Sequence, residues 1–288
     1  MATLRDIRRR INSVRSTQQI TKAMKMVAAA RLRRAQENIL KARPYAYELR
    51  EVIGHITGLV DRSLHPLLEK REVRRVGLVV VTADRGLCGA FNMNIIRRTT
   101  QEIDALQADA KDVELILVGR KSREFFRRRS FPIISEYYDF YNHLNFSHAQ
   151  RISQEIIRLY QERQLDQITV IYNEFKSAIQ QRIVAEKLLP LEPQMPEGIS
   201  GAVQYIYEPS PDALLEVLLP RQINIQMWRI LLESNAAEQG ARMTAMEMAT
   251  ENAEEMIHKL TLYYNRVRQA TITKEIIEIV SGAEALKS

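Results

Sequence analysis

The chain has 288 residues, of which 45% are hydrophobic, and it carries a formal net charge of +7. This composition is sufficient for a packed core and predicts one or two domains. No uninterrupted apolar run approaches about 18 residues, so no transmembrane helix is expected. The single cysteine, Cys88, excludes a disulfide framework within the chain and a redox switch made of two of its thiols.

Residues 1–60 have the apolar pattern of a long coiled-coil helix. When heptads are counted from Leu4, 14 of the 17 a and d positions are apolar. A period of 3.5 residues kept over this length indicates a coiled coil, and about 55 residues would span roughly 80 Å. The helical pattern also continues too far for a mitochondrial presequence, and no secretory signal is expected. Pro44 is the only proline in the segment and is a candidate bend.

Residues 73–207 alternate between short β-rich runs and amphipathic segments, which predicts an α/β domain with a mainly parallel sheet. The strand candidates are Val76–Thr82, Leu115–Gly119, Ile168–Tyr172, Arg182–Leu189 and Ala202–Tyr207. The helix candidates are Asn92–Leu106, Lys121–Arg129 and Ser147–Arg163.

Residues 211–286 repeat the pattern of the first segment. In heptads counted from Ile225, 12 of the 16 a and d positions are apolar. The helix is expected to begin near Pro211, to be kinked or interrupted at Pro220, and to reach Gly282 or slightly beyond. The sequence therefore predicts an inserted Rossmann-like α/β domain between two terminal helices, which form a long antiparallel coiled coil.

Polar residues interrupt each apolar stripe once. The two groups are Gln18, Thr21 and Lys25 in the first helix, and Asn235, Gln239 and Arg242 in the second. Unpaired polar groups in a helix seam are costly, so we expect the groups to face each other, with residue numbers that add up to about 260. Residue 4 would then face residue 256, and residues 257–286 would project alone by roughly 45 Å. Because much of that tail is apolar, we expect other subunits to enclose it.

The segment Asp84–Asn92 follows a predicted strand and precedes a helix, where phosphate-binding loops occur. It lacks both G-x-G-x-x-G and the Walker A pattern, so a structural turn is favoured over a nucleotide site. For Cys88, a packed small side chain is favoured over a nucleophile. The five histidines lack metal-ligand spacing, so no metal site is predicted. We also predict no other cofactor and no catalytic residue.

The first helix is strongly basic, since residues 1–50 contain 13 Lys and Arg against three Asp and Glu. Its charge can be a solvated face, a nucleic-acid surface or a surface for acidic loops of a partner. Nucleic acid is disfavoured because no aromatic residue precedes Tyr45. We therefore predict that Arg8, Arg9 and Lys25 contact an acidic partner.

Several segments resemble the gamma subunits of F-type ATP synthases. These segments are Ile20–Ala28, Thr82–Gly89, Tyr205–Pro209, Glu238–Met243 and Tyr264–Thr273. They occur in all three parts of the chain and in the order expected for that family. The rival interpretations are a free-standing coiled-coil protein and a nucleotide-dependent enzyme.

The resemblance implies a central-stalk rotor subunit without catalytic residues, on the cytoplasmic face of a bacterial membrane. Its partners would be the alpha, beta and epsilon subunits and the c-ring. By analogy with the family, Arg268, Gln269 and Thr273 would contact a loop of beta, and Met24 and Arg242 would lie near its acidic lever region. Tyr205 and Tyr207 would lie near the c-ring and epsilon.

Overall fold

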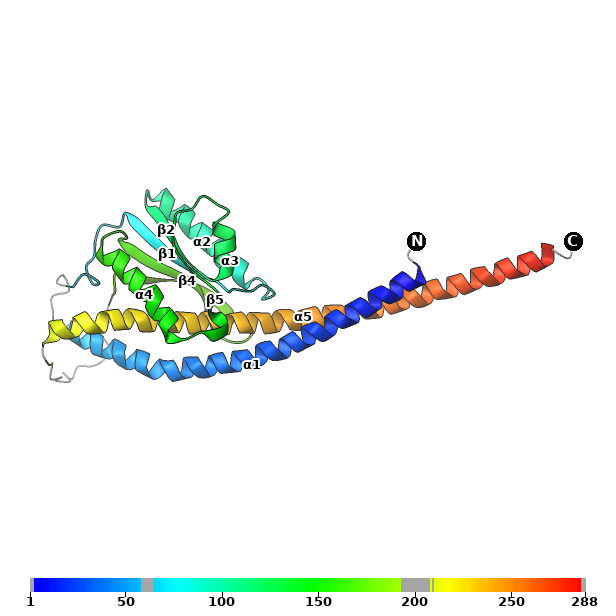
Figure 1. Cartoon of the computed structure of the whole chain (residues 1–288), viewed down its shortest axis with the longest axis horizontal. Coiled ribbons are helices and arrows are strands. Elements are labelled where there is room, and N and C mark those ends of the chain that lie inside the picture. Colours follow the sequence, from blue (N-terminus) through cyan, green and yellow to red (C-terminus); the bar gives the residue numbers. More distant parts are fainter. Residues whose placement is uncertain (1–2, 58–64, 193–207, 209, 286–288) are drawn as a thin grey trace. The chain divides into compact units, whose positions relative to one another are not determined.

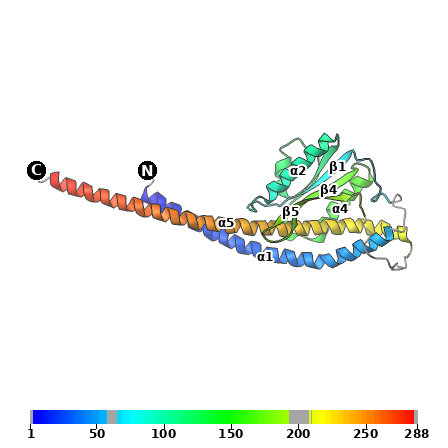
Figure 2. The ribbon, with the colours of Figure 1, turned by 180° about the vertical axis from the view of Figure 1, so that it is seen from behind.

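The computed structural model describes residues 3–57, 65–192, 208 and 210–285. The chain divides into two compact units. The helical unit comprises residues 1–28 and 243–288, and the sheet unit comprises residues 29–242. The two longest helices, α1 (Leu4–Thr57) and α5 (Pro211–Ala285), contribute to both units. Figure 1 and Figure 2 show the elements from opposite sides.

The coiled-coil pattern predicted for α1 is confirmed. Each a and d position from Leu4 to Ile56 is buried or half-buried, whereas most of the positions between them are exposed. Pro44 lies inside α1 and Pro220 lies inside α5, so neither proline ends its helix. α5 begins at Pro211, as predicted, and runs past Gly282 to Ala285.

The predicted helix register is wrong. Within the helical unit, Thr21 Oγ1 lies 2.8 Å from Thr250 Oγ1, and Lys25 Nζ lies 2.5 Å from Glu247 Oε1. The numbers of these facing residues add up to 271 and 272, about three helical turns away from the predicted 260. Thr21 and Lys25 therefore do not face Gln239 and Asn235 as predicted, but Thr250 and Glu247.

The predicted stripe of α5 is also partly wrong in the helical unit. Met256 and Tyr263 were assigned to the seam, but they are 45% and 46% exposed. The neighbouring Ile257 and Tyr264 are half-buried instead. The predicted positions Ala253, Leu260 and Val267 are buried or half-buried, so up to Val267 the stripe differs from the prediction at alternate positions only.

The sheet unit contains a five-stranded sheet in the order β3-β2-β1-β4-β5. The strands are β1 (Arg75–Val81), β2 (Asp112–Val118), β3 (Ile133–Tyr137), β4 (Gln167–Phe175) and β5 (Gln181–Leu189). β1 to β4 are parallel to one another, with Leu78 opposite Leu115 and Thr169, and β5 is antiparallel to β4. The predicted, mainly parallel sheet is therefore confirmed.

Helices cover both faces of the sheet (Figure 1). α2 (Phe91–Ala108) and α3 (Arg120–Phe126) pack on one face, against side chains such as Leu78 and Val80 of β1. α4 (Phe146–Gln161) packs on the other face together with the parts of α1 and α5 that belong to this unit. Alternate residues of β1 thus enter two different cores, as expected for a strand buried on both sides.

The sequence missed β3. Its five residues are all half-buried and include Ser135 and Glu136, so it lacks the continuous apolar run that marks the inner strands. A short 3-10 turn, η2 (Tyr141–His143), follows it. The strand predicted at Ala202–Tyr207 lies outside the described residues.

Candidate functional site

The loop after β1 is organised by hydrogen bonds within the chain. The Ala83 N–H donates to Asn92 Oδ1 at 2.9 Å, and Asn92 Nδ2 donates to the Arg85 carbonyl at 3.2 Å. The Asn92 side chain, from the first turn of α2, thus bridges both ends of the loop. Leu87 and Gly89 adopt φ values of 62° and 58°, which produce the tight turn. These contacts are those of a structural turn.

A second close contact fixes this loop to the start of α3. A Cβ at Gly119, where φ is 96°, would lie 2.1 Å from the Thr82 carbonyl oxygen, so only glycine fits there. The Arg120 N–H donates to Asp84 Oδ1 at 3.0 Å, and the Ser122 N–H donates to Thr82 Oγ1 at 2.9 Å. The loop is therefore rigidly positioned.

Helix α5 is fastened to the same loop through Arg242. Its Nη1 donates to the Gly86 carbonyl at 2.6 Å, and its Nη2 pairs with Glu238, one helical turn earlier. Arg242 and Glu238 are only 9% and 5% exposed. Burial raises the pKa of Glu238, while Arg242 opposes that rise. A guanidinium held in this way is an internal attachment, and its predicted contact with a partner stays a prediction.

Cys88 is buried beside this attachment, 1% exposed, and accepts a hydrogen bond from Asn92 Nδ2 at 3.2 Å. Burial raises the pKa of its thiol, and the nearby Glu238 raises it further. A nucleophilic or metal-binding cysteine needs the thiolate, which a raised pKa disfavours. The packed thiol favoured by the sequence fits these surroundings.

The predicted contact residues of the helical unit divide into two groups. Arg8 Nη2 donates to the Tyr264 hydroxyl at 2.8 Å, and Lys25 is paired with Glu247, so these two cations partly serve the helix pair itself. Met24 is half-buried. The exposed residues available to a partner are Arg9, Arg268, Gln269 and Thr273.

The end of α5 is apolar and exposed. Ile272, Ile276, Ile277, Ile279 and Val280 are between 47% and 72% exposed. The last described contact of α1 with this region joins Arg8 to Tyr264, and α5 continues beyond the start of α1 (Figure 2). The corrected register shortens the unpaired tail, but these five large apolar side chains remain exposed on it.

The residues that pair with the candidate residues within the chain were mostly not predicted. Glu238 lies four residues before Arg242, a spacing that predicts a helix ion pair. Glu247 and Thr250 gave no such signal, because their partners lie on the other helix. Tyr205 and Tyr207 lie outside the described residues.

Over the ranges given above, no cluster of three or more His, Cys, Asp or Glu is placed to hold a metal ion. In the same part of the chain, no helix combines the length and the apolar character needed to cross a bilayer.

Comparisons with known proteins identify the family. A family model described as ATP synthase matches residues 3–286. The ATP synthase gamma chain of Chlorobium phaeobacteroides is 51% identical, with both chains fully covered. That of Heliobacterium modesticaldum is 50% identical, and the match covers 99% of this chain and all of the relative.

Solved structures agree with the fold. A chain from the central stalk and c-ring of the Tetrahymena thermophila mitochondrial ATP synthase is 26% identical with a TM-score of 0.60, covering 80% of this chain and 99% of the other. A chain of the Euglena gracilis enzyme gives 0.71 at 20% identity, which shows the fold alone, and covers 98% of this chain and 94% of the other. The family match and the bacterial relatives together lead to one conclusion: this chain belongs to the ATP synthase gamma-chain family.

Proposed function

We propose that this chain is the rotating central shaft of a bacterial ATP synthase and contributes no catalytic residue. In this role it couples rotation of an ion-driven c-ring to conformational changes in the alpha and beta subunits, which bind and convert the nucleotide. The complex would lie at the cytoplasmic face of the cell membrane. The chain would also bind the epsilon subunit.

The exposed apolar end of α5 is the observation that supports this proposal most directly. Five large aliphatic side chains between residues 272 and 280 lie open in the isolated chain. Such a surface is costly in water and marks a binding site for an apolar partner. Apolar contacts lack the directionality of hydrogen bonds, so an apolar sleeve of alpha and beta subunits would hold this end while it turns.

The charged surface of the helical unit would provide the contacts that change with rotation. Arg9 and Arg268 are exposed, and exposed ion pairs are individually weak. Such contacts can form and break with successive acidic loops at little cost. A shaft whose faces differ would favour a different nucleotide affinity in each catalytic subunit, because the contacts differ in each orientation.

Reconstitution tests this role. The purified chain alone is expected to hydrolyse no ATP, whereas addition of alpha and beta subunits should restore ATP hydrolysis. A probe attached to the sheet unit should then rotate during turnover. Hydrolysis by the isolated chain, or full activity of alpha and beta without it, would contradict the proposal.

The exposed tail allows a sharper test. Replacing Ile276 and Ile279 with Asp should weaken association with the alpha and beta subunits, because two charges would enter the apolar sleeve. The matched control replaces the exposed Glu275 and Glu278 of the same turn with Gln, which leaves the apolar surface intact. Equal association of both double variants would show that the apolar tail is not the binding surface.

A further inference from the structure

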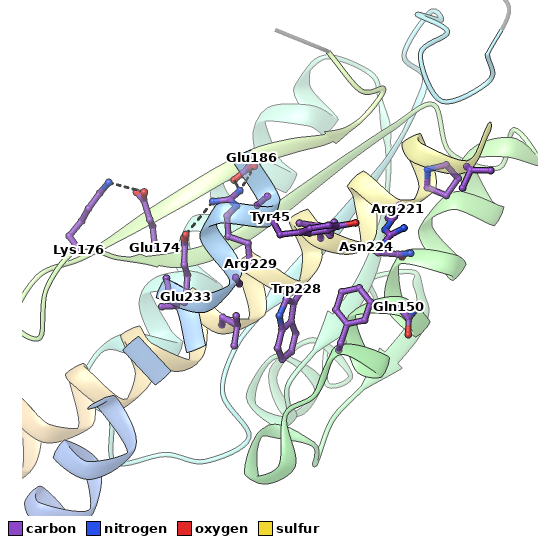
Figure 3. Close-up of a pocket in the computed structure, with 18 residues that line it drawn as sticks. Tyr45, Gln150, Glu174, Lys176, Glu186, Arg221, Asn224, Trp228, Arg229 and Glu233 are labelled. Carbon is purple, nitrogen blue, oxygen red and sulfur yellow. Dashed lines mark hydrogen bonds and ion pairs between the residues drawn. The ribbon is translucent and has the colours of Figure 1, made fainter. Parts of the chain in front are cut away.

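Arg229 of α5 contacts two neighbouring strands of the sheet. Its Nη2 donates to both carboxylate oxygens of Glu186 on β5, at 2.5 and 2.7 Å (Figure 3). Its Nη1 donates to the Tyr172 hydroxyl on β4 at 3.3 Å, and that hydroxyl donates to Glu186 Oε2 at 2.9 Å. The three side chains therefore form a closed hydrogen-bonded set between one helix and two strands.

This set is largely shielded from water. The side chains of Arg229 and Glu186 are 25% and 26% exposed, and Tyr172 is buried. Glu233, one turn further along α5, places its Oε1 3.4 Å from Arg229 Nη1 and so holds the guanidinium from its own helix (Figure 3). A charged contact with two oxygens fixes an angle as well as a distance, and partial burial strengthens it.

Arg242 makes a second polar attachment between α5 and the sheet unit. Arg229 precedes its carboxylate partner Glu233 by four residues, whereas Arg242 follows Glu238 by four residues. Arg229 reaches β5, and Arg242 reaches the loop after β1. The two arginines are 13 positions apart, which corresponds to about 20 Å along the helix and about 140° around it. Contacts that leave α5 in such different directions oppose its rotation about its own axis.

Most other contacts of α5 in this unit are apolar. Leu219, Ile223 and Leu231 belong to the buried core, together with side chains of α1, α4 and the sheet. Apolar burial is non-directional, whereas a charged contact with two oxygens is directional. The polar attachments are therefore the contacts best suited to fix the angle of the helix.

This angle matters because α1 and α5 form the covalent connection between the two units. The chain passes from one unit to the other at residues 28–29 in α1 and at residues 242–243 in α5. Arg229 and Arg242 hold α5 directly before its crossing point. Twisting of α5 at this place would absorb part of any torque applied to the sheet unit.

We propose that Arg229 is a positioning residue of the rotor, which together with Glu186 and Tyr172 locks α5 to the sheet unit against twisting. Torque applied to this unit then reaches the tail of α5 with less elastic loss. This inference rests on the proposed rotor function. An ion pair that only stabilises the fold would affect stability without a specific effect on torsional stiffness.

The torsional stiffness of the assembled complex tests this role. The alpha and beta subunits are fixed to a surface, and a bead is attached through a cysteine at the exposed Asp104 of α2 in a Cys88→Ser background. The angular fluctuations of the bead are then recorded without ATP. Glu186→Gln should increase their variance by up to about twofold, because one of two comparable polar attachments is lost. Arg229→Lys keeps the charge but not the two-oxygen contact, so it should give a smaller increase.

Glu136→Gln is the matched control. Glu136 is a half-buried carboxylate of β3 that pairs with Arg123 of α3, so the same chemical change breaks a helix–strand ion pair that does not involve α5. It should leave the variance unchanged. The rate of ATP hydrolysis should be that of the wild type in Glu186→Gln, because Glu186 is not among the residues proposed to contact alpha or beta.

The same assay separates the two levels of the argument. A wild-type bead that does not rotate when ATP is added would contradict the rotor function itself. If the wild-type bead rotates but neither Glu186→Gln nor Arg229→Lys increases the variance, the role of Arg229 is refuted. An equal increase in Glu136→Gln would also refute it, because the effect would then reflect general loosening of the sheet unit.

Discussion

Replacing Gly240 with alanine should destabilise the chain, although a Gly→Ala change inside a helix usually stabilises it. Glycine inside a helix normally costs about 1 kcal/mol relative to alanine, so Gly→Ala should stabilise α5. A Cβ at Gly240, however, would lie 2.9 Å from the carbonyl oxygen of Ala178 and 3.4 Å from its Cα. These are backbone atoms of the turn between β4 and β5, and they cannot move aside as the end of a side chain can.

The expected net effect of Gly240→Ala is destabilisation. Overpacking costs about 1–3 kcal/mol, and the helix gain of about 1 kcal/mol offsets part of it, which leaves a loss of up to about 2 kcal/mol. The turn itself should loosen, because Ser177 and Gln180 are hydrogen-bonded to each other there at 3.0 Å. Hydrogen exchange at their amides should therefore accelerate, and chemical denaturation should show the loss in the free energy of unfolding.

Gly282 provides the matched control, because it lies in the same helix and a Cβ there would have no neighbour within 4 Å. Gly282→Ala should increase helix protection near residue 282 and leave exchange at Ser177 and Gln180 unchanged. If Gly240→Ala also increased stability and left the turn amides unaffected, the close approach of α5 to the turn would be refuted.

Four further predictions concern charged and titratable groups. Glu186→Gln should cost about 1–3 kcal/mol because Arg229 loses its two-oxygen contact and keeps only the longer one to Glu233, whereas Glu233→Gln should cost less. Since burial raises the pKa of Glu233, its ionisation lowers stability as pH rises through that pKa, and thermal unfolding of Glu233→Gln should lack this decline. Cys88 should react with a chromogenic thiol reagent only after unfolding, and a fast reaction in the native chain would contradict its burial. A double-mutant cycle on Lys25 and Glu247, both over one third exposed, should give a coupling below about 1 kcal/mol, and a clearly larger coupling would contradict this.

Most of the fold can be predicted from local patterns in the sequence. Every a and d position of the 3.5-residue stripe from Leu4 to Ile56 is buried or half-buried, because a helix seam repeats the same physical requirement along its length. The apolar runs of β1, β2 and β4 were equally clear, since strands buried on both faces exclude polar residues. β3 was not predicted, because it is an edge strand whose half-buried Ser135 and Glu136 interrupt the apolar run.

The candidate site was less predictable because its contacts join distant parts of the chain. The polar residues Gln239 and Arg242 were read as seam residues that needed partners on α1. Arg242 instead bonds the Gly86 carbonyl, 156 positions away, and this contact depends on the folded loop after β1. A stripe pattern indicates that a polar residue is buried, but it does not identify which element buries it.

The register of the helical unit can be decided by a pair of cysteine variants. Thr21 and Thr250 have their hydroxyl oxygens 2.8 Å apart, so cysteines at these positions should form a disulfide on mild oxidation in a Cys88→Ser background. The register predicted from the polar groups would instead bring residue 11 opposite residue 249. Cysteines at Ile11 and Ala249 should therefore remain reduced, because the observed register separates them by about three helical turns along the seam. A disulfide between residues 11 and 249, with Thr21→Cys and Thr250→Cys left reduced, would support the register that matches the polar groups and would refute the Thr21–Thr250 contact.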